Sequence, residues 1–277
     1  MNLIPKLQPT AEAILTEFLC HKVNSAGSKG MVLGLSGGVD SAVVLALGAK
    51  ALGKKNVLAV FMPEQDSPMG DLEDVRMLSR HFGVELKVMD ITRILETFKE
   101  EAGVIGHSSK VASGNLKARA RMLALYWIAN SGNYLVCGTS NKTEMLVGYF
   151  TKFGDGASDI APLGDLYKTQ VWELAKVLGV PEKIVSKVPT AGLYPGQTDE
   201  DELGVKYHVL DQILFGLDQG MSHQEIVGSL QPTGSGDHKT IARVESLIKG
   251  SSHKRVLTKI PKIGARTIGI DRRECVD

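Results

Sequence analysis

Short apolar runs alternate with helix-like segments through the first half of the chain. The runs cover residues 31–35, 57–62, 85–91 and 134–139, and each has the length of a buried strand. Between the second and third runs, Leu72, Val75, Leu78 and Phe82 recur at helical spacing. Strands that alternate with helices at this spacing predict an α/β fold, with one Rossmann-like parallel sheet flanked by helices in a single domain.

The pattern predicts further helices on either side of these runs. A helix over residues 10–23 comes before the first strand, and one that ends at Gly53 follows it. The helix expected from Asn115 to residue 131 is so apolar in its second half that other elements, or a second subunit, must cover it. Later segments predict helices near 171–178 and 203–217. A polar loop at 150–162 comes before the first of these helices, and another at 191–201 separates the two.

One loop at the end of the first strand carries the clearest chemistry. Its sequence, Ser36-Gly37-Gly38-Val39-Asp40-Ser41, lies between two apolar runs and therefore reads as strand, turn and helix start. Two glycines let the backbone N–H groups point into one concavity, and the helix N-terminus favours an anion such as pyrophosphate. Because Asp40 would repel that anion, a divalent cation between them is expected, so the loop predicts a nucleotide with magnesium.

Better-known phosphate loops do not match this stretch. Kinase-type and GTPase-type loops end in Gly-Lys-Ser or Gly-Lys-Thr, and the dinucleotide fingerprint needs a third glycine where Ser41 stands. An ordinary strand-to-helix turn stays open as an alternative, because Asp and Ser are also good helix caps.

Composition narrows the class of protein. The 277 residues are 43% hydrophobic, which is enough for a full core, and the net charge of +1 provides no general attraction to nucleic acid or membranes. No apolar run approaches the roughly 18 residues of a membrane span, and no signal-peptide pattern opens the sequence, so a cytoplasmic location is expected. The isolated cysteines Cys20, Cys137 and Cys275 favour neither a zinc site nor a disulfide framework.

Four further motifs resemble NAD synthetases. They are Gly114-Asn115 with Arg119 and Arg121; Gly138-Thr139-Ser140-Asn141 with Glu144; Thr151-Lys152-Phe153-Gly154-Asp155; and Pro189-Thr190 with Gln197-Thr198-Asp199-Glu200. Together with the Ser36–Ser41 loop, which N-type ATP pyrophosphatases share, they resemble the ammonia-dependent NAD synthetases in order over about residues 10–255. The resemblance implies the adenine nucleotide alpha-hydrolase-like fold and one enzymatic domain over 1–255. The basic tail over 256–277 is poorly covered by the match, and its charges leave four readings open: it is flexible, closes over the site, binds a partner subunit or is simply solvated.

The resemblance also implies the reaction. Such ligases adenylate the carboxylate of deamido-NAD with ATP, release pyrophosphate, and then let ammonia displace AMP to form NAD. No protein nucleophile is needed, and the relatives act as cytoplasmic homodimers with the dinucleotide bound across the interface. Glutamine-dependent relatives carry an additional glutaminase region, so the resemblance implies ammonia as the nitrogen source here; whether a separate glutaminase delivers it stays open.

Site residues follow by matching positions within these motifs. Asp40 and Glu144 match the magnesium ligands, and Asp155 matches the acid that binds ammonium and takes its proton, so Asp155 and Lys168 are the predicted catalytic pair. The predicted ATP residues are Gly34, Leu35, Ser36, Gly37, Gly38, Val39, Asp40, Ser41, Thr139, Lys168 and Thr190. The predicted deamido-NAD residues are Arg119, Lys152, Asp159, His253 and Lys254.

Two other functions share parts of this pattern. Another amidating or thiolating enzyme could carry the same loop, although thiolating enzymes commonly use cysteines or an RNA-binding domain. A non-catalytic nucleotide-binding module could also carry it, but such a module would have no use for Glu144, Lys152, Asp155 and Lys168 together.

Overall fold

A four-stranded parallel sheet forms the centre of the molecule. The computed structural model describes residues 3–103, 109–194, 196–230 and 237–256, with positions 261 and 263. The strands are β1 Gly30–Gly34, β2 Val57–Phe61, β3 Glu85–Val88 and β4 Tyr134–Val136. They lie in the order β3-β2-β1-β4, and all three pairings are parallel. The predicted α/β class is therefore confirmed, and the strand order reverses direction between β1 and β4.

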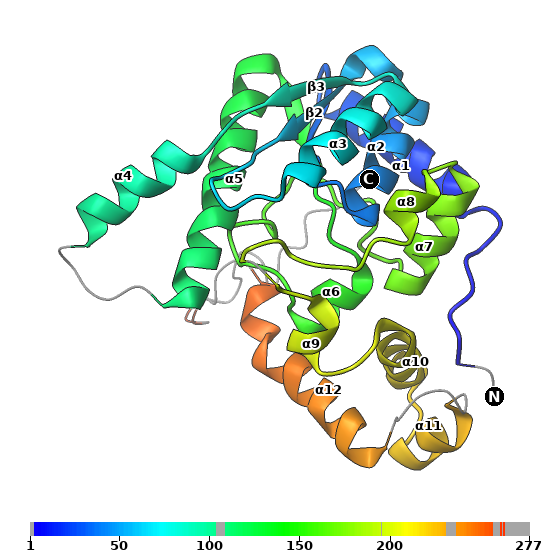
Figure 1. Cartoon of the computed structure of the whole chain (residues 1–277). Helices are drawn as coiled ribbons and strands as arrows, with labels where there is room; N and C mark the ends of the chain where they lie inside the picture. Colours follow the sequence, from blue (N-terminus) through cyan, green and yellow to red (C-terminus); the bar gives the residue numbers. More distant parts are fainter. Residues whose placement is uncertain are drawn as a thin grey trace.

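Helices cover both faces of this sheet and form a second group beside it (Figure 1). Their bounds are α1 Ala11–Ser25, α2 Val39–Leu52, α3 Met69–Phe82, α4 Thr92–Ala102, α5 Lys110–Gly132, α6 Lys142–Val147, α7 Lys168–Val177, α8 Glu182–Val185, α9 Asp199–Leu203, α10 Tyr207–Asp218, α11 His223–Ser229 and α12 His238–Gly250. Short 3-10 turns occupy Lys54–Asn56 and Ser252–Lys254. Across these described ranges, no helix is long and apolar enough to span a membrane.

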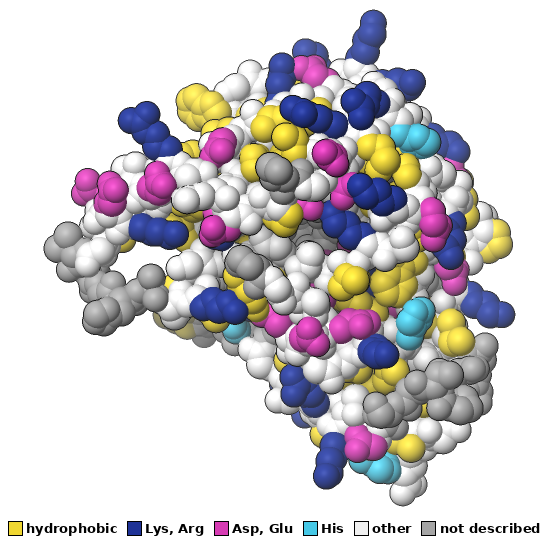
Figure 2. Space-filling model, in the orientation of Figure 1, with side chains coloured by type: hydrophobic (Ala, Val, Ile, Leu, Met, Phe, Trp, Pro, Cys, Tyr) yellow, Lys and Arg dark blue, Asp and Glu magenta, His cyan; other side chains and the backbone are white. Residues whose placement is uncertain are grey.

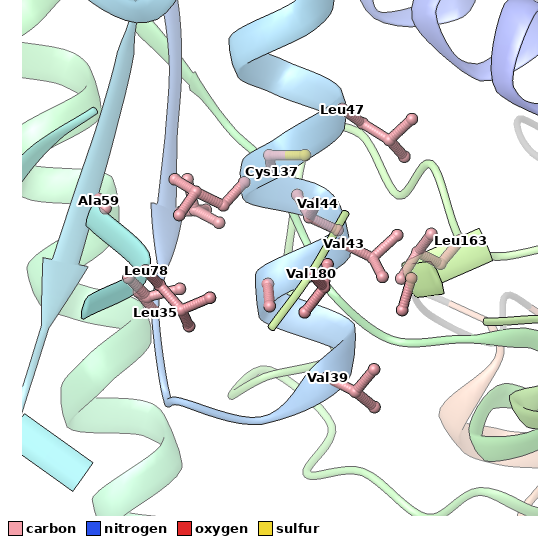
Figure 3. Packing of buried hydrophobic residues seen from close by; sticks show 14 of the residues in the cluster. Leu35, Val39, Val43, Val44, Leu47, Ala59, Leu78, Cys137, Leu163 and Val180 are labelled. Carbon is pink, nitrogen blue, oxygen red and sulfur yellow. The ribbon is translucent and has the colours of Figure 1, made fainter. Parts of the chain in front are cut away.

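The two-residue period of the strands separates the core into two layers. Met31 and Leu33 point to the side where α2 packs, whereas Val32 between them points to the side of α5. Figure 3 shows the α2 layer, in which Val43 and Val44 are completely buried. A Cβ on Gly48 would lie 2.0 Å from the Met31 methyl carbon, so the absence of a side chain at Gly48 makes room for the end of the Met31 side chain.

A separate apolar cluster joins the C-terminal helices. Tyr207, Leu210 and Ile213 of α10 are buried against Ile241 and Val244 of α12. In Figure 1, α6 and α9 lie between this helical group and the sheet, so they connect the two cores. Figure 2 shows acidic and basic side chains interspersed over this face, without a large block of one sign, in keeping with the near-neutral net charge.

Two predicted strands are shorter than expected. β3 ends at Val88 instead of residue 91, because the Asp90 carboxylate accepts the Thr92 N–H at 2.7 Å and turns the chain into α4, which the sequence reading did not predict. β4 ends at Val136, after which only Cys137 continues the ladder through an isolated bridge to Ile160.

Two predicted helix boundaries were also wrong. α5 begins at Lys110 rather than Asn115, because Ser109 caps it by accepting the Ala112 N–H at 3.1 Å. The helix predicted over 203–217 is two helices, since Gly204 at φ 70° ends α9 before α10 begins. The division of the chain at residue 255 stays a prediction, and most of the tail lies outside the described residues.

Candidate active site

The main pocket opens at the carboxyl end of the sheet, where the segments after β1 and β4 diverge. It is a cavity of about 440 Å³, a size typical of small-molecule sites. The predicted positions along its wall are Gly34, Leu35, Ser36, Gly38, Val39, Asp40, Ser41, Thr139, Glu144, Asp155, Lys168, Thr190 and Lys254. A switch point of strand order is where open α/β sheets bind ligands, so the fold places these residues together for a topological reason.

The Ser36–Ser41 loop is held in shape by its own serines. The Ser41 hydroxyl donates to the Gly38 carbonyl at 3.0 Å and accepts the Ser36 N–H at 3.2 Å. Ser36 Oγ in turn accepts the Gly38 N–H at 3.2 Å. Gly37 has φ 82°, a conformation that side chains disfavour, so the first glycine is required by the backbone. The first N–H groups of α2 have no partner within the helix, which leaves the loop suited to an anion.

A buried lysine joins the two predicted magnesium ligands. Lys168, at the start of α7, is 2% exposed, and its Nζ lies 2.5 Å from Asp40 Oδ2 and 3.4 Å from Glu144 Oε1. Asn141 adds a second link: its amide donates to Asp40 Oδ1 at 2.9 Å, while its Oδ1 accepts the Glu144 N–H at 3.0 Å. Three elements far apart in sequence, α2, α6 and α7, thus meet in one charged cluster.

The cluster carries more negative than positive charge. Burial and the neighbouring Asp40 raise the pKa of Glu144 to about 8, although Lys168 acts in the opposite direction. Burial also raises the pKa of Asp199, whose Oδ2 accepts the Tyr207 hydroxyl at 2.9 Å. The pKa of Lys168 is raised despite its burial, because Asp40 and Glu144 stabilise the ammonium. An additional cation would relieve this excess charge.

The donor chemistry fits magnesium. Asp40 and Glu144 offer hard carboxylate oxygens of the kind that Mg²⁺ prefers, together with substrate phosphates. Within the described ranges, no group of three or more His, Cys, Asp and Glu side chains could hold a metal by itself. Two carboxylates that leave further positions to phosphates and water match the usual protein contribution to a nucleotide-bound magnesium.

Asp155 faces the same pocket from the loop after α6. Its Oδ1 accepts the Thr151 N–H at 2.9 Å, and Lys254 attracts it from the far end of the chain. The carboxylate is open to solvent through the pocket mouth, yet the protein atoms crowded around it raise its pKa above the usual value for aspartate. A carboxylate with a raised pKa is a stronger base, which suits proton removal from a nascent amine.

Two of the predicted dinucleotide residues, Lys152 and Lys254, line a second cavity that adjoins the main pocket. Lys152 Nζ donates to the His253 carbonyl at 2.6 Å, and Arg119 donates to the Lys152 carbonyl at 3.2 Å, so these three residues form one basic group. Lys254 donates to the carbonyls of Gly148 and Phe150, each at 2.7 Å, which fixes its position between the cavities.

Some predicted residues are less well placed for direct binding. Gly37, Arg119, Asp159 and His253 do not line either cavity among the described residues. Both carboxylate oxygens of Asp159 already accept bonds, from the Val136 N–H at 2.8 Å and the Tyr126 hydroxyl at 3.2 Å. In this arrangement Asp159 secures the end of β4.

The sequence reading missed several residues of the charged cluster. Asn141 is fully buried beside Asp40, and the pattern Asn-x-x-Glu, a capping-box signature, could have indicated its link to Glu144. Asp199 and Arg121 also line the main pocket. Nothing in the acidic run after Thr198 indicates that Asp199 is buried while Asp201 and Glu202 are exposed. Cys137 is buried and burial raises the pKa of its thiol, so it behaves as an apolar core residue.

Comparisons with known proteins match nearly the whole chain. The family model described as NAD synthase matches residues 12–258. The NH(3)-dependent NAD(+) synthetase of Thermococcus kodakarensis is 48% identical over 90% of this chain and 95% of its own length, and that of Archaeoglobus fulgidus is 45% identical over the same shares. Among solved structures, the NMN synthetase from Francisella tularensis has a TM-score of 0.79 at 36% identity, covering 91% of this chain and 97% of that one. The NH3-dependent NAD synthetase from Campylobacter jejuni has a TM-score of 0.76 at 33% identity, covering 91% and 98%.

Proposed function

This chain belongs to the NAD synthase family, and we infer that it is a carbon–nitrogen ligase that converts deamido-NAD to NAD with ATP and ammonia. The observation that carries this conclusion is the agreement between the family match over residues 12–258 and the pocket, in which the Ser36–Ser41 loop, Glu144 and Lys168 converge. A non-catalytic nucleotide-binding module would not need the buried Asp40–Lys168–Glu144 cluster, whose charges are costly to bury.

In the first step, an oxygen of the substrate carboxylate attacks the α-phosphorus of ATP, and the bond from that phosphorus to the bridging oxygen of pyrophosphate breaks. Two anions must approach each other, so the protein contributes mainly charge neutralisation and positioning. We assign the pyrophosphate to the backbone N–H groups of the Ser36–Ser41 loop. Lys168, held between Asp40 and Glu144, supplies a fixed positive charge beside it.

In the second step, ammonia attacks the carbonyl carbon of the adenylated carboxylate, and the carbon–oxygen bond to AMP breaks. The nitrogen then carries an additional proton, which a nearby base must accept. We assign this proton to the Asp155 carboxylate, which faces the pocket and has a raised pKa. Asp155 and Lys168 are therefore the proposed catalytic residues.

Magnesium is the proposed cofactor, held by Asp40 and Glu144. When bound, the ion would neutralise phosphate charge during adenylation. Burial and the neighbouring Asp40 raise the pKa of Glu144, and a cation beside the two carboxylates would offset both effects, which supports this assignment. Lys168 lies between the two carboxylates in the described structure, so it must share or yield part of that space when the ion binds.

A homodimer is the proposed assembly, and α5 is the proposed contact. Leu123 and Trp127 lie one helical turn apart on α5 and are 62% and 73% exposed. Two large apolar side chains on one exposed face are typical of a surface that a second subunit covers. The proposed location of this assembly is the cytoplasm.

A second candidate function differs from the first in the size of the acid substrate. The Francisella tularensis neighbour is an NMN synthetase, so the same chemistry on the mononucleotide acid is a candidate for this chain as well. Lys152 and Lys254 line the second cavity, and Arg119 donates to the Lys152 carbonyl. These positive charges support a substrate with an additional phosphate, which favours the dinucleotide.

One assay tests both candidates. The purified protein is incubated with ATP, magnesium, ammonium and either deamido-NAD or the mononucleotide acid, and AMP and the amide product are quantified. We expect NAD and AMP in equal amounts, and a larger kcat/KM for deamido-NAD. Faster amidation of the mononucleotide would replace the first function by the second, whereas no amidation of either acid would reject both.

A further inference from the structure

Asp211 of α10 is fully buried, although it is a carboxylate and lies outside the pocket. None of the pocket-lining residues, within the described part of the chain, comes from α10. Burying a carboxylate is costly unless its oxygens are well bonded. Both oxygens are bonded: Oδ1 accepts the Thr143 hydroxyl at 2.6 Å, and Oδ2 accepts the Thr169 N–H at 2.8 Å.

These two partners are the chain neighbours of the charged cluster. Thr143 directly precedes Glu144 on α6, and Thr169 directly follows Lys168 on α7. The Thr143 hydroxyl, while donating to Asp211, also accepts the backbone N–H of Lys168 at 3.0 Å. A single hydroxyl and a single carboxylate therefore join the first turns of the two helices that carry Glu144 and Lys168.

The network is shielded from water. Thr143 and Asp211 are completely buried, and Thr169 is 8% exposed. Hydrogen bonds to an ionised group are stronger and shorter than neutral ones, and water cannot substitute for a partner that is removed here. A change at Asp211 is therefore transmitted to α6 and α7 as a shift of their first turns.

We propose that Asp211 is a positioning residue that fixes Glu144 and Lys168 relative to each other, so that both face Asp40. Asp211 acts through Thr143 and through the start of α7, and it touches no substrate. The proposal rests on the proposed function for its activity readout, but the geometry on which it depends, Lys168 Nζ at 3.4 Å from Glu144 Oε1, belongs to the free protein.

Asp211→Asn is the direct test. The amide keeps the side-chain volume of Asp211. In either orientation, however, its NH2 group faces one of the two groups that donate to Asp211 in the parent protein, so a donor meets a donor. We expect a folded variant whose kcat for NAD falls at least about tenfold, which corresponds to about 1.36 kcal/mol, with the KM for deamido-NAD within twofold of the parent. The magnesium concentration for half-maximal rate should rise.

Thr143 provides a rescue test. Thr143→Ser keeps the hydroxyl and should keep most of the activity, whereas Thr143→Val should match Asp211→Asn. Because both residues act as one unit, the double variant Thr143→Val with Asp211→Asn should be no slower than either single variant. If Asp211→Asn does not fold, the serine and valine variants decide the question.

Tyr167→Phe is the matched control. The Tyr167 hydroxyl donates to Asp218 at 2.5 Å, so it also links the start of α7 to α10, and its hydrogen bond among the described residues goes to Asp218 and not to Thr143. We expect this variant to lose some stability and to keep kcat and the magnesium response. A Tyr167→Phe variant as slow as Asp211→Asn, a Thr143→Ser variant as slow as Thr143→Val, or an Asp211→Asn variant within twofold of the parent would each overturn the proposal.

Binding separates this proposal from the function itself. Calorimetric titration of the protein with an α,β-methylene analogue of ATP and magnesium measures nucleotide binding at the charged cluster without turnover. We expect about tenfold weaker binding to Asp211→Asn than to the parent, and equal binding would overturn the positioning role. A parent protein that binds the analogue but forms no NAD would instead reject the proposed function.

Discussion

Replacing Lys168 with methionine tests whether the buried lysine holds Asp40 and Glu144 together. Methionine keeps much of the side-chain volume and removes the charge. At the observed separations of 2.5 and 3.4 Å, the two ion pairs are worth about 7 and about 5 kcal/mol of Coulomb energy at an effective dielectric constant of about 20. Leaving a buried charge without its partner typically costs about 3–5 kcal/mol of unfolding free energy, after relaxation.

The loss should depend on pH, because the carboxylates can take up protons. Lys168 lowers the pKa of Glu144 against burial and Asp40, so its removal raises that pKa above the present value of about 8. A carboxyl group whose pKa is raised by folding does not destabilise the folded protein at low pH, where the group is protonated. It lowers the free energy of unfolding as pH rises through its folded-state pKa. We expect a loss of about 3–5 kcal/mol near pH 8.5. Near pH 6 the loss should be smaller, by up to about 1 kcal/mol, because Glu144 is mostly protonated there in both proteins and ionises near pH 8.5 mainly in the parent.

Urea unfolding followed by circular dichroism at the two pH values measures this difference. Lys142→Met is the matched control: Lys142 also contacts two carboxylates, Asp218 at 2.8 Å and Asp165 at 3.3 Å, but its side chain is 24% exposed. An exposed pair of this kind contributes about 0–1 kcal/mol. Magnesium should stabilise Lys168→Met more than the parent, because the ion then replaces the ammonium between the carboxylates.

Two results would refute this reasoning. One is a Lys168→Met variant whose unfolding free energy lies within about 1 kcal/mol of the parent at pH 8.5, which would mean that the two carboxylates do not depend on the lysine. The other is a large loss that is equal at both pH values, which would mean that lost packing, and not charge, destabilises the variant.

Three further predictions concern the site and the assembly. Asp40→Ala should abolish AMP and NAD formation while the circular dichroism spectrum stays unchanged, and wild-type turnover would remove Asp40 from the magnesium site. Asp155→Asn should slow amidation more than adenylation, measured as the ratio of NAD to AMP under single turnover; equal loss of both steps would remove Asp155 from the ammonia site. Trp127→Glu on the exposed face of α5 should shift the protein to a monomer in sedimentation, and an unchanged sedimentation coefficient would argue against α5 as the contact.

The local pattern of the sequence was sufficient for the elements that carry the loop. The alternation of apolar runs and helical spacing predicts β1, β2 and the parallel sheet, because strands buried on both faces need continuous apolar residues. It predicted β3 but extended the strand to residue 91, and it did not predict α4 or α12, although both helices carry apolar residues at helical spacing. Element ends depended on single hydrogen bonds, such as the Ser109 cap, that the apolar pattern does not record.

The sequence by itself determined the conformation of the Ser36–Ser41 loop. Glycine is required where φ is 82°, and the serines stabilise the turn through hydrogen bonds within the loop. The sequence did not determine which residues contact Asp40. Lys168 is 128 positions away from Asp40, and only the packing of α7 beside α2 brings the ammonium to the carboxylate. The charge excess, the raised pKa of Glu144 and the support from Asp211 follow from burial, and burial is a property of the whole fold that no short stretch of sequence contains.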